Sequence, residues 1–304
     1  MNKKKILIIQ RRPGIGDMCL FFPCIDEICK AFKDYEIFLL TNKRSKSNEI
    51  LKDYDGIKKI YFYEKFRGFL GFFKLINFMK SKQFDDIIIF HYGLKYFLAS
   101  KLCNIDKIFN YGFKKKNENI VNESRKLVKI ILNRNDLVFS PYFDFYKKKK
   151  IFEQNILFGI AGSGDDKKWG IENFIELAKK IYAIKKIKII VAGGKEEKKD
   201  YDYIKKKLSN FDIDSICDLT IQDSLEFISN SSLYIGNDTG FMHLAGALRV
   251  KSFGLFGNTP TNYASYNNNI TPIIPENFER ITHGSEAMDK ITVNYVFDRI
   301  KEFI

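Results

Sequence analysis

The chain has 304 residues, of which 51 are Lys or Arg and 37 are Asp or Glu, and its formal net charge is +14. This length is long for one hydrophobic core and indicates two domains of ordinary size. Five scattered cysteines without a C-x-x-C pair argue against both a disulfide framework and a zinc site. No run approaches a membrane-spanning length, and the apolar run after the basic first residues is too short for a signal peptide, so we expect a cytoplasmic protein.

The positive charge favours anionic partners through long-range attraction. Three classes follow, which are nucleic acid, the anionic inner leaflet of a membrane and a phosphorylated glycolipid. The lysines are spread along the chain without an Arg-rich stripe or a recognisable nucleic-acid module, so we expect no nucleic-acid partner. Much of the excess charge is typical of a solvated, Lys-rich surface.

In the first half, short β-branched runs alternate with amphipathic stretches, the pattern of a parallel sheet covered by helices. The expected strands are Lys5–Gln10, Glu36–Thr41, Lys59–Tyr63, Asp86–Phe90 and Lys107–Asn110. A helix is expected over Asp17–Phe32. The segment Ser140–Lys150, with Pro141 and a run of lysines, reads as a hinge, which predicts domains at residues 1–145 and 146–304.

The second half repeats the alternation. Its expected strands are Asn155–Ala161, Lys188–Ala192, Ser215–Leu219, Leu233–Gly236 and Ser252–Phe256. Helices are expected near Ile171–Ile184, Lys195–Ser209, Gly240–Leu248 and Asn294–Phe303. The fold class is therefore α/β, with two Rossmann-like doubly wound domains.

The most informative local pattern is the turn Asp238-Thr239-Gly240 between an apolar strand and a small-residue helix. The first turn of a helix leaves backbone N–H groups without partners and carries the positive end of the helix dipole, so an anion is stabilised there. Gly240 has no Cβ and lets a phosphate approach the backbone. The turn is thus a candidate phosphate site, although an ordinary N-cap has the same composition.

Ligands of open α/β sheets bind outside the carboxyl ends of the strands. Five loops therefore share ligand-facing edges, and we expect them to converge on one central cleft between the domains. They are Gly14–Asp17 with Gly16, Ala161–Lys167, Gly193–Glu197, Asp238–Gly240 and Gly257–Thr259.

Three segments together resemble glycosyltransferase family 9, the heptosyltransferase group of lipopolysaccharide assembly. They are Gly14-Ile-Gly-Asp17 with Pro23, Asp238-Thr-Gly-Phe-Met-His-Leu-Ala245 and Ser252–Thr261. A further block, Gly162–Trp169, is similar to the donor-phosphate loop of that family. The resemblance implies a GT-B fold, with an acceptor-binding first domain and a nucleotide-sugar-binding second domain. It also implies that the last helix crosses back and packs on the first domain. It also implies inverting transfer of a heptose, with ADP-heptose as the expected donor, to a lipopolysaccharide or lipooligosaccharide core or a related glycan. Peripheral contact at the inner face of the cytoplasmic membrane is a further expectation from the resemblance.

A nucleotide diphosphate at the second domain's edge would meet Ser163, Lys167, Thr239 and the amide of Gly240, with Asp238 shaping the turn. The family places a Glu near the ribose, which fits Glu196 or its neighbour Glu197, since a carboxylate can accept two adjacent hydroxyl donors. His243 could bond the phosphate or lock the turn against the sheet.

Asp17 is the candidate general base that takes the proton of the acceptor hydroxyl, a role that the resemblance assigns to it. The competing interpretation is a helix N-cap, and the two are compatible because a cap uses one carboxylate oxygen.

No metal and no cofactor are expected, because Lys167 and the helix terminus already neutralise the leaving diphosphate, and the Asp-x-Asp triplets lie away from the expected cleft. A Rossmann oxidoreductase is disfavoured, since Cys19 replaces the third Gly of G-x-G-x-x-G and no acid ends the second strand. A catalytically inactive or epimerase-type nucleotide-sugar-binding protein remains the alternative.

Overall fold

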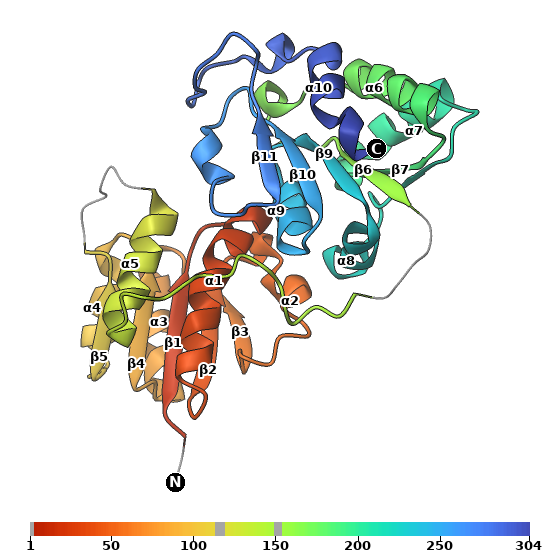
Figure 1. The fold of residues 1–304 in the computed structure, drawn as a ribbon. Coiled ribbons are helices and arrows are strands. Elements are labelled where there is room, and N and C mark those ends of the chain that lie inside the picture. Colours follow the sequence, from red (N-terminus) through yellow and green to blue (C-terminus); the bar gives the residue numbers. More distant parts are fainter. Residues whose placement is uncertain (1–2, 113–118, 149–153) are drawn as a thin grey trace. The chain divides into compact units, whose positions relative to one another are not determined.

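The computed structural model describes residues 3–112, 119–148 and 154–304. The chain divides into two compact units, Met1–Pro141 and Tyr142–Ile304 (Figure 1). The division falls inside the expected hinge segment, whose last two residues, Lys149 and Lys150, lie outside the described residues.

The first unit is a five-stranded parallel sheet with the order β3-β2-β1-β4-β5. Its strands are β1 (Lys5–Gln10), β2 (Glu36–Thr41), β3 (Lys59–Phe62), β4 (Asp86–Phe90) and β5 (Lys107–Asn110). Its helices are α1 (Ile15–Ala31), α2 (Ser47–Ile50), α3 (Gly68–Lys82), α4 (Leu94–Lys101) and α5 (Ile120–Leu132). The strand predictions of this half agree with the structure to within one residue.

Helices cover both faces of this sheet, which explains why β1 and β4 are almost continuously apolar. Leu7 and Ile9 of β1 point to the core shared with α3 and α4. On the other face α1 packs against α5, and the Phe21 ring of α1 lies 5.7 Å from the ring of Phe90.

The second unit is a six-stranded parallel sheet with the order β11-β10-β9-β6-β7-β8. Its strands are β6 (Asn155–Gly159), β7 (Lys188–Ala192), β8 (Ile213–Ser215), β9 (Leu233–Asn237), β10 (Lys251–Leu255) and β11 (Ile270–Ile273). Its helices are α6 (Ile171–Ile184), α7 (Lys198–Lys207), α8 (Ile221–Asn230), α9 (Gly240–Ala247) and α10 (Val293–Ile300).

Three expectations for this half need correction. The strand expected at Ser215–Leu219 begins two residues earlier, because Ile213–Ser215 pair with β7 and the chain then turns at Leu219. The edge strand β11 was not expected. The last helix, expected on the first domain, instead packs against α6, with Val296 and Ile300 buried in the core of the second unit.

Both sheets have a switch point. There the strands that come later in the chain are added on the opposite side of the unit's first strand, β1 or β6. It lies between β1 and β4 in the first unit and between β6 and β9 in the second. Doubly wound sheets bind ligands at the carboxyl ends of the strands beside this point. The loops after these four strands are therefore the places to look for a site.

Candidate active site

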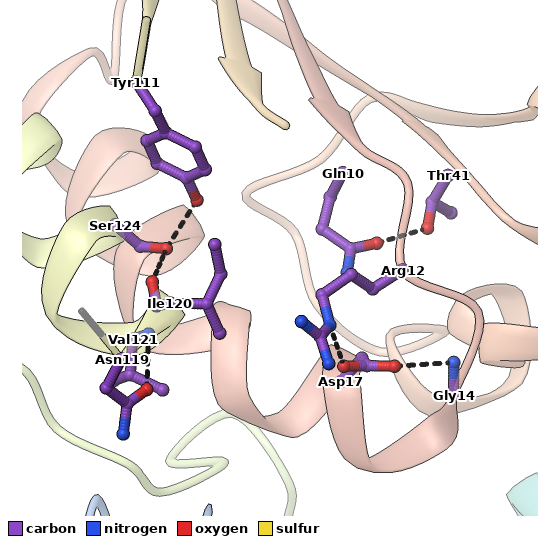
Figure 2. Close-up of polar contacts among 10 residues, drawn as sticks. All are labelled: Gln10, Arg12, Gly14, Asp17, Thr41, Tyr111, Asn119, Ile120, Val121 and Ser124. Carbon is purple, nitrogen blue, oxygen red and sulfur yellow. Dashed lines mark hydrogen bonds and ion pairs between the residues drawn. The ribbon is translucent and has the colours of Figure 1, made fainter. Parts of the chain in front are cut away.

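Asp17 lies in the first turn of α1, directly after the loop that follows β1. Its Oδ2 accepts the backbone N–H of Gly14 at 3.0 Å, and its Oδ1 accepts the Nε–H of Arg12 at 2.5 Å (Figure 2). Gly14 is the N-cap residue and Gly16 is the second residue of α1, so the helix begins two residues earlier than expected. Asp17 is therefore the third helical residue and bonds back to the cap, which corrects the expectation of an N-cap at Asp17 itself.

Each carboxylate oxygen of Asp17 thus has one partner. An ionised carboxylate offers about four lone-pair sites, so two remain open for a proton from a substrate. The Asp17 side chain is 15% exposed, which leaves it reachable from the carboxyl edge of the sheet. Arg12 and Gly14 fix its orientation.

Cationic side chains gather at the same edge, from the segments that follow β1, β3 and β4. Arg11 Nη1 lies 3.4 Å from His91 Nε2, and the Arg11 guanidinium lies 4.9 Å from the centre of the Tyr63 ring. Arg67 also lies over that ring, at 5.3 Å, and donates to Tyr63 Oη at 3.0 Å. Lys95 Nζ donates to the backbone carbonyl of Phe66. We call Arg11, Arg67 and Lys95 the cation cluster.

The electrostatics of these groups show a site with an excess of positive charge. Burial, reinforced by the charge of Arg11, lowers the pKa of His91 to about 4. The same two causes lower the pKa of Lys95. The hydrogen bond to Tyr63 raises the pKa of Arg67, and the Glu64 carboxylate adds a smaller effect in the same direction. Glu64 Oε1 accepts the backbone N–H of Lys43. A cluster of three cations suits an anionic ligand.

In the second unit, Asn237 ties together the two loops beside the switch point. Its side chain is fully buried at the end of β9. Its Nδ2 donates to the carbonyls of Ile160 and Ala161 at 2.9 and 3.0 Å, and its Oδ1 accepts the backbone N–H of Trp169 at 3.0 Å. Asn237 therefore fixes the spacing between the loop after β6 and the start of α9.

The turn Asp238–Gly240 leads into α9, whose N-cap is Thr239. The Thr239 side chain does not cap the helix, and the first turn of α9 holds no acidic residue. The Thr239 hydroxyl instead lies 3.4 Å from Tyr234 Oη. The amides of this first turn are thus left for another acceptor, such as a phosphate oxygen.

His243 is 5% exposed and both its ring nitrogens face protein groups. Nδ1 lies 3.0 Å from Tyr266 Oη, and Nε2 lies 3.6 Å from Asp238 Oδ1. These contacts hold the turn, and they favour the locking role among the two that the sequence left open.

The loop after β6 presents two lysines with different surroundings. Lys168 Nζ pairs with Glu197 Oε1 at 3.3 Å, whereas Lys167 has no ion-pair partner among the described residues. Ser163, in the same loop, is exposed. Lys167 and Ser163, the two residues expected to meet the donor, therefore remain available to a ligand.

The two candidate glutamates after β7 are also distinguished by their contacts. Glu197 is buried, with its Oε2 on the backbone N–H of Gly194 at 2.9 Å and its Oε1 on Lys168. Glu196 is exposed, and its side chain makes no hydrogen bond or ion pair in the described part of the chain. The contacts favour Glu196 as the carboxylate that is available to a ribose.

The loop after β10 is built around Asn258, a residue that the sequence did not single out. Its Nδ2 donates to Asp166 of the loop after β6, and its Oδ1 accepts the N–H of Gly284 at 2.7 Å. Gly257 lies against the backbone of Met288, where a Cβ would come within 2.4 Å of the Met288 nitrogen. Thr259 is 6% exposed, and its hydroxyl has no hydrogen-bond partner among the described residues.

The described residues contain no group of three or more His, Cys, Asp or Glu side chains placed to hold a metal ion. Within the same ranges, no helix has the length and apolar character needed to cross a bilayer.

A sequence model of glycosyltransferase family 9 (heptosyltransferase) matches residues 72–286, which is more than half of the chain. The chain belongs to glycosyltransferase family 9. This confirms the resemblance inferred from the motifs, and the protein is a glycosyltransferase. All the second-unit site residues lie inside the matched range, whereas Asp17 and Arg11 lie outside it.

Individual relatives agree with this membership. The family 9 chain is 24% identical to lipopolysaccharide heptosyltransferase 1 of Campylobacter coli over 94% of its length and 93% of the relative's. Its fold is similar to E. coli heptosyltransferase WaaC with ADP-2-deoxy-2-fluoro heptose, with a TM-score of 0.77, 15% identity, and coverage of 99% and 100% of the two chains. For E. coli ADP-heptose lps heptosyltransferase II, the TM-score is 0.75, the sequence identity is 17%, and the match covers 98% of each chain. The expected GT-B fold class is confirmed.

Proposed function

We propose that this family 9 glycosyltransferase moves a heptose from an ADP-linked donor to an anionic acceptor of the lipopolysaccharide core, with inversion at the anomeric carbon and without a metal ion. The names of its relatives support the sugar, the nucleotide and the acceptor class. The observation that carries the assignment of the donor site is the uncapped start of α9, together with the unpaired Lys167 in the loop that Asn237 ties to the end of β9.

The donor diphosphate fits this edge of the second sheet by charge and by hydrogen bonding. The first-turn amides of α9 and the positive end of its dipole stabilise one phosphate, and Lys167 supplies a full charge to the other. The buried hydroxyl of Thr259 gains a partner if it bonds an oxygen of the donor. Glu196 would accept the ribose hydroxyls.

The acceptor fits the edge of the first sheet. The cation cluster would hold a phosphate or carboxylate of the glycolipid through charge-assisted hydrogen bonds. The attacking hydroxyl then gives its proton to the open lone pairs of Asp17 as its oxygen bonds to the anomeric carbon. The bond from that carbon to the diphosphate breaks, and its electron pair leaves with the diphosphate, where Lys167 and the α9 amides stabilise it.

Calorimetric titration of the protein with ADP-, UDP-, GDP- and TDP-linked sugars measures the affinity for each donor and tests the nucleotide assignment. We expect ADP-heptose to bind most tightly and ADP to compete with it. A preference for a uridine or guanosine donor would overturn the nucleotide assignment. Transfer to a purified core glycolipid, with the new linkage read by NMR, tests the acceptor and the inversion, and retention of anomeric configuration would refute the single-displacement mechanism.

A further inference from the structure

The outer face of α3 is unusually apolar for a surface helix. Phe69, Leu70 and Phe73 are 77%, 72% and 50% exposed. The rings of Phe69 and Phe73, one turn apart, lie 5.2 Å from each other. The inner face is firmly packed, since Gly71 lies so close to the Phe66 backbone that a Cβ would come within 2.3 Å of it. The exposed aromatic side chains therefore sit on a fixed support.

The neighbouring helix α4 continues this surface. Leu94, Leu98 and Leu102, spaced four residues apart on one side of α4 and its last turn, are 52%, 47% and 56% exposed. The two helices contact each other, and the Cys103 thiol donates to the carbonyl of Ile76 in α3 at 3.6 Å. We call the six exposed residues of α3 and α4 the apolar patch.

Charge on these helices has one sign. Three lysines lie in α3 and two in α4, and neither helix contains an Asp or a Glu. Large exposed apolar patches mark surfaces that bind a protein or a membrane. A patch with aromatic and leucine side chains beside lysines is typical of helices that lie in the interface of an anionic bilayer.

We propose that the apolar patch docks the first unit onto an anionic lipid bilayer, with Phe69, Leu70 and Phe73 entering the headgroup region and Lys74 and Lys101 contacting acidic headgroups. A second copy of the chain fits this surface less well, because its own lysines would oppose those of the first. The patch also begins next to the cation cluster, since Arg67 precedes α3 directly and Lys95 follows Leu94. Docking would thus present a membrane glycolipid to that cluster, a last step that rests on the proposed function.

The test uses the whole protein and vesicles of phosphatidylglycerol and phosphatidylethanolamine that contain no glycolipid. Flotation should recover the wild type with these vesicles and far less with neutral phosphatidylcholine vesicles. The triple variant Phe69→Ser, Leu70→Ser, Phe73→Ser should lose at least about tenfold in partitioning. The pair Lys74→Glu, Lys101→Glu should lose about fivefold or more per charge at low salt.

The matched controls are Ile130→Ser with Val138→Ser, which remove side chains that are 72% and 85% exposed elsewhere on the same unit, and Lys33→Glu with Lys52→Glu for charge. Both controls should partition like the wild type. Phe69→Trp, in a chain whose single tryptophan is buried, should show a blue shift with anionic vesicles and quenching by brominated lipid. This variant reports insertion even if the triple variant fails to fold.

The proposal is overturned if the wild type does not float with anionic vesicles, if the triple variant floats as well as the wild type, or if Phe69→Trp shows no shift. A concentration-dependent dimer that the triple variant abolishes would assign the patch to a second copy instead. Failure of the donor assignment leaves this test unaffected, because the vesicles contain neither substrate.

Discussion

The change Asp17→Asn separates the general base from the helix support that the same side chain provides. Asparagine has the same size, and its carbonyl oxygen can still accept the Gly14 N–H that lies 3.0 Å from Asp17 Oδ2. Its amide cannot take a proton from the acceptor hydroxyl. We therefore expect transfer to fall by roughly a hundredfold or more, the usual contribution of a general base. Donor affinity should be unchanged, because the groups proposed to bind the donor all belong to the second unit.

The effect on stability should be small and can be worked out from the contacts. Asp17→Asn removes the ion pair with Arg12, whose side chain is 39% exposed, and such a pair contributes about 0–1 kcal/mol to the free energy of unfolding. Asp17→Ala also removes the bond to Gly14, which adds about 1 kcal/mol. Thermal unfolding of both variants measures this difference alongside turnover.

A matched control lies on the same helix. The Asp26 side chain is 14% exposed and pairs with Lys30 Nζ at 2.6 Å, so Asp26→Asn removes a similar ion pair from α1 far from the carboxyl edge. This control should keep normal turnover. Near-normal transfer by Asp17→Asn, or an equal loss of transfer in Asp26→Asn, would refute the assignment of Asp17 as the base.

Four further outcomes are expected. Lys167→Ala should weaken nucleoside diphosphate binding by roughly ten- to hundredfold in calorimetry, because it removes a charge-assisted contact, whereas Lys179→Ala on the exposed side of α6 should not. Gly240→Val should weaken binding at least as much, since a branched Cβ blocks the phosphate, and unchanged affinity would contradict the α9 site. Transfer should persist in excess chelator, and a loss that magnesium or manganese restores would refute the metal-independent mechanism. His91 should titrate near pH 4 in NMR spectra, below its unfolded value of about 6.5, so folding stability should fall as the pH drops through this window and fall less in His91→Gln.

The regular strands could be predicted because they are buried on both faces, and Asp86–Phe90 is an example of the resulting apolar run. The edge strand β11 was not predicted, because it is only four residues long and contains Pro272. A proline weakens the sequence pattern of a strand, although an edge strand tolerates it. Helix α3 gave no helical periodicity, since Phe69 and Phe73 on its outer face are as apolar as Leu75 and Met79 on its inner face.

In the site, the motifs located the loops but not the partners within them. The sequence alone could not choose between Glu196 and Glu197, because the choice depends on Lys168 reaching Glu197 from another loop. The sequence also did not predict that Arg12 orients Asp17 or that Asn237 holds the loop after β6. Arg12 reads as a loop arginine, and Asn237 bonds to residues about 70 positions earlier in the chain, a contact that only the assembled sheet creates.

The starts of α1 and α9 follow strands at the two switch points and differ in one electrostatic respect. In α1 the acid of the first turn, Asp17, already bonds to the cap amide and faces the dipole. In α9 the first turn has neither a side-chain cap nor an acid. A phosphate would be repelled by Asp17 at the first helix and stabilised by free amides at the second. These differences support the proposed placement of the diphosphate at α9, and Asp17 keeps open lone pairs for the proton that the acceptor must lose.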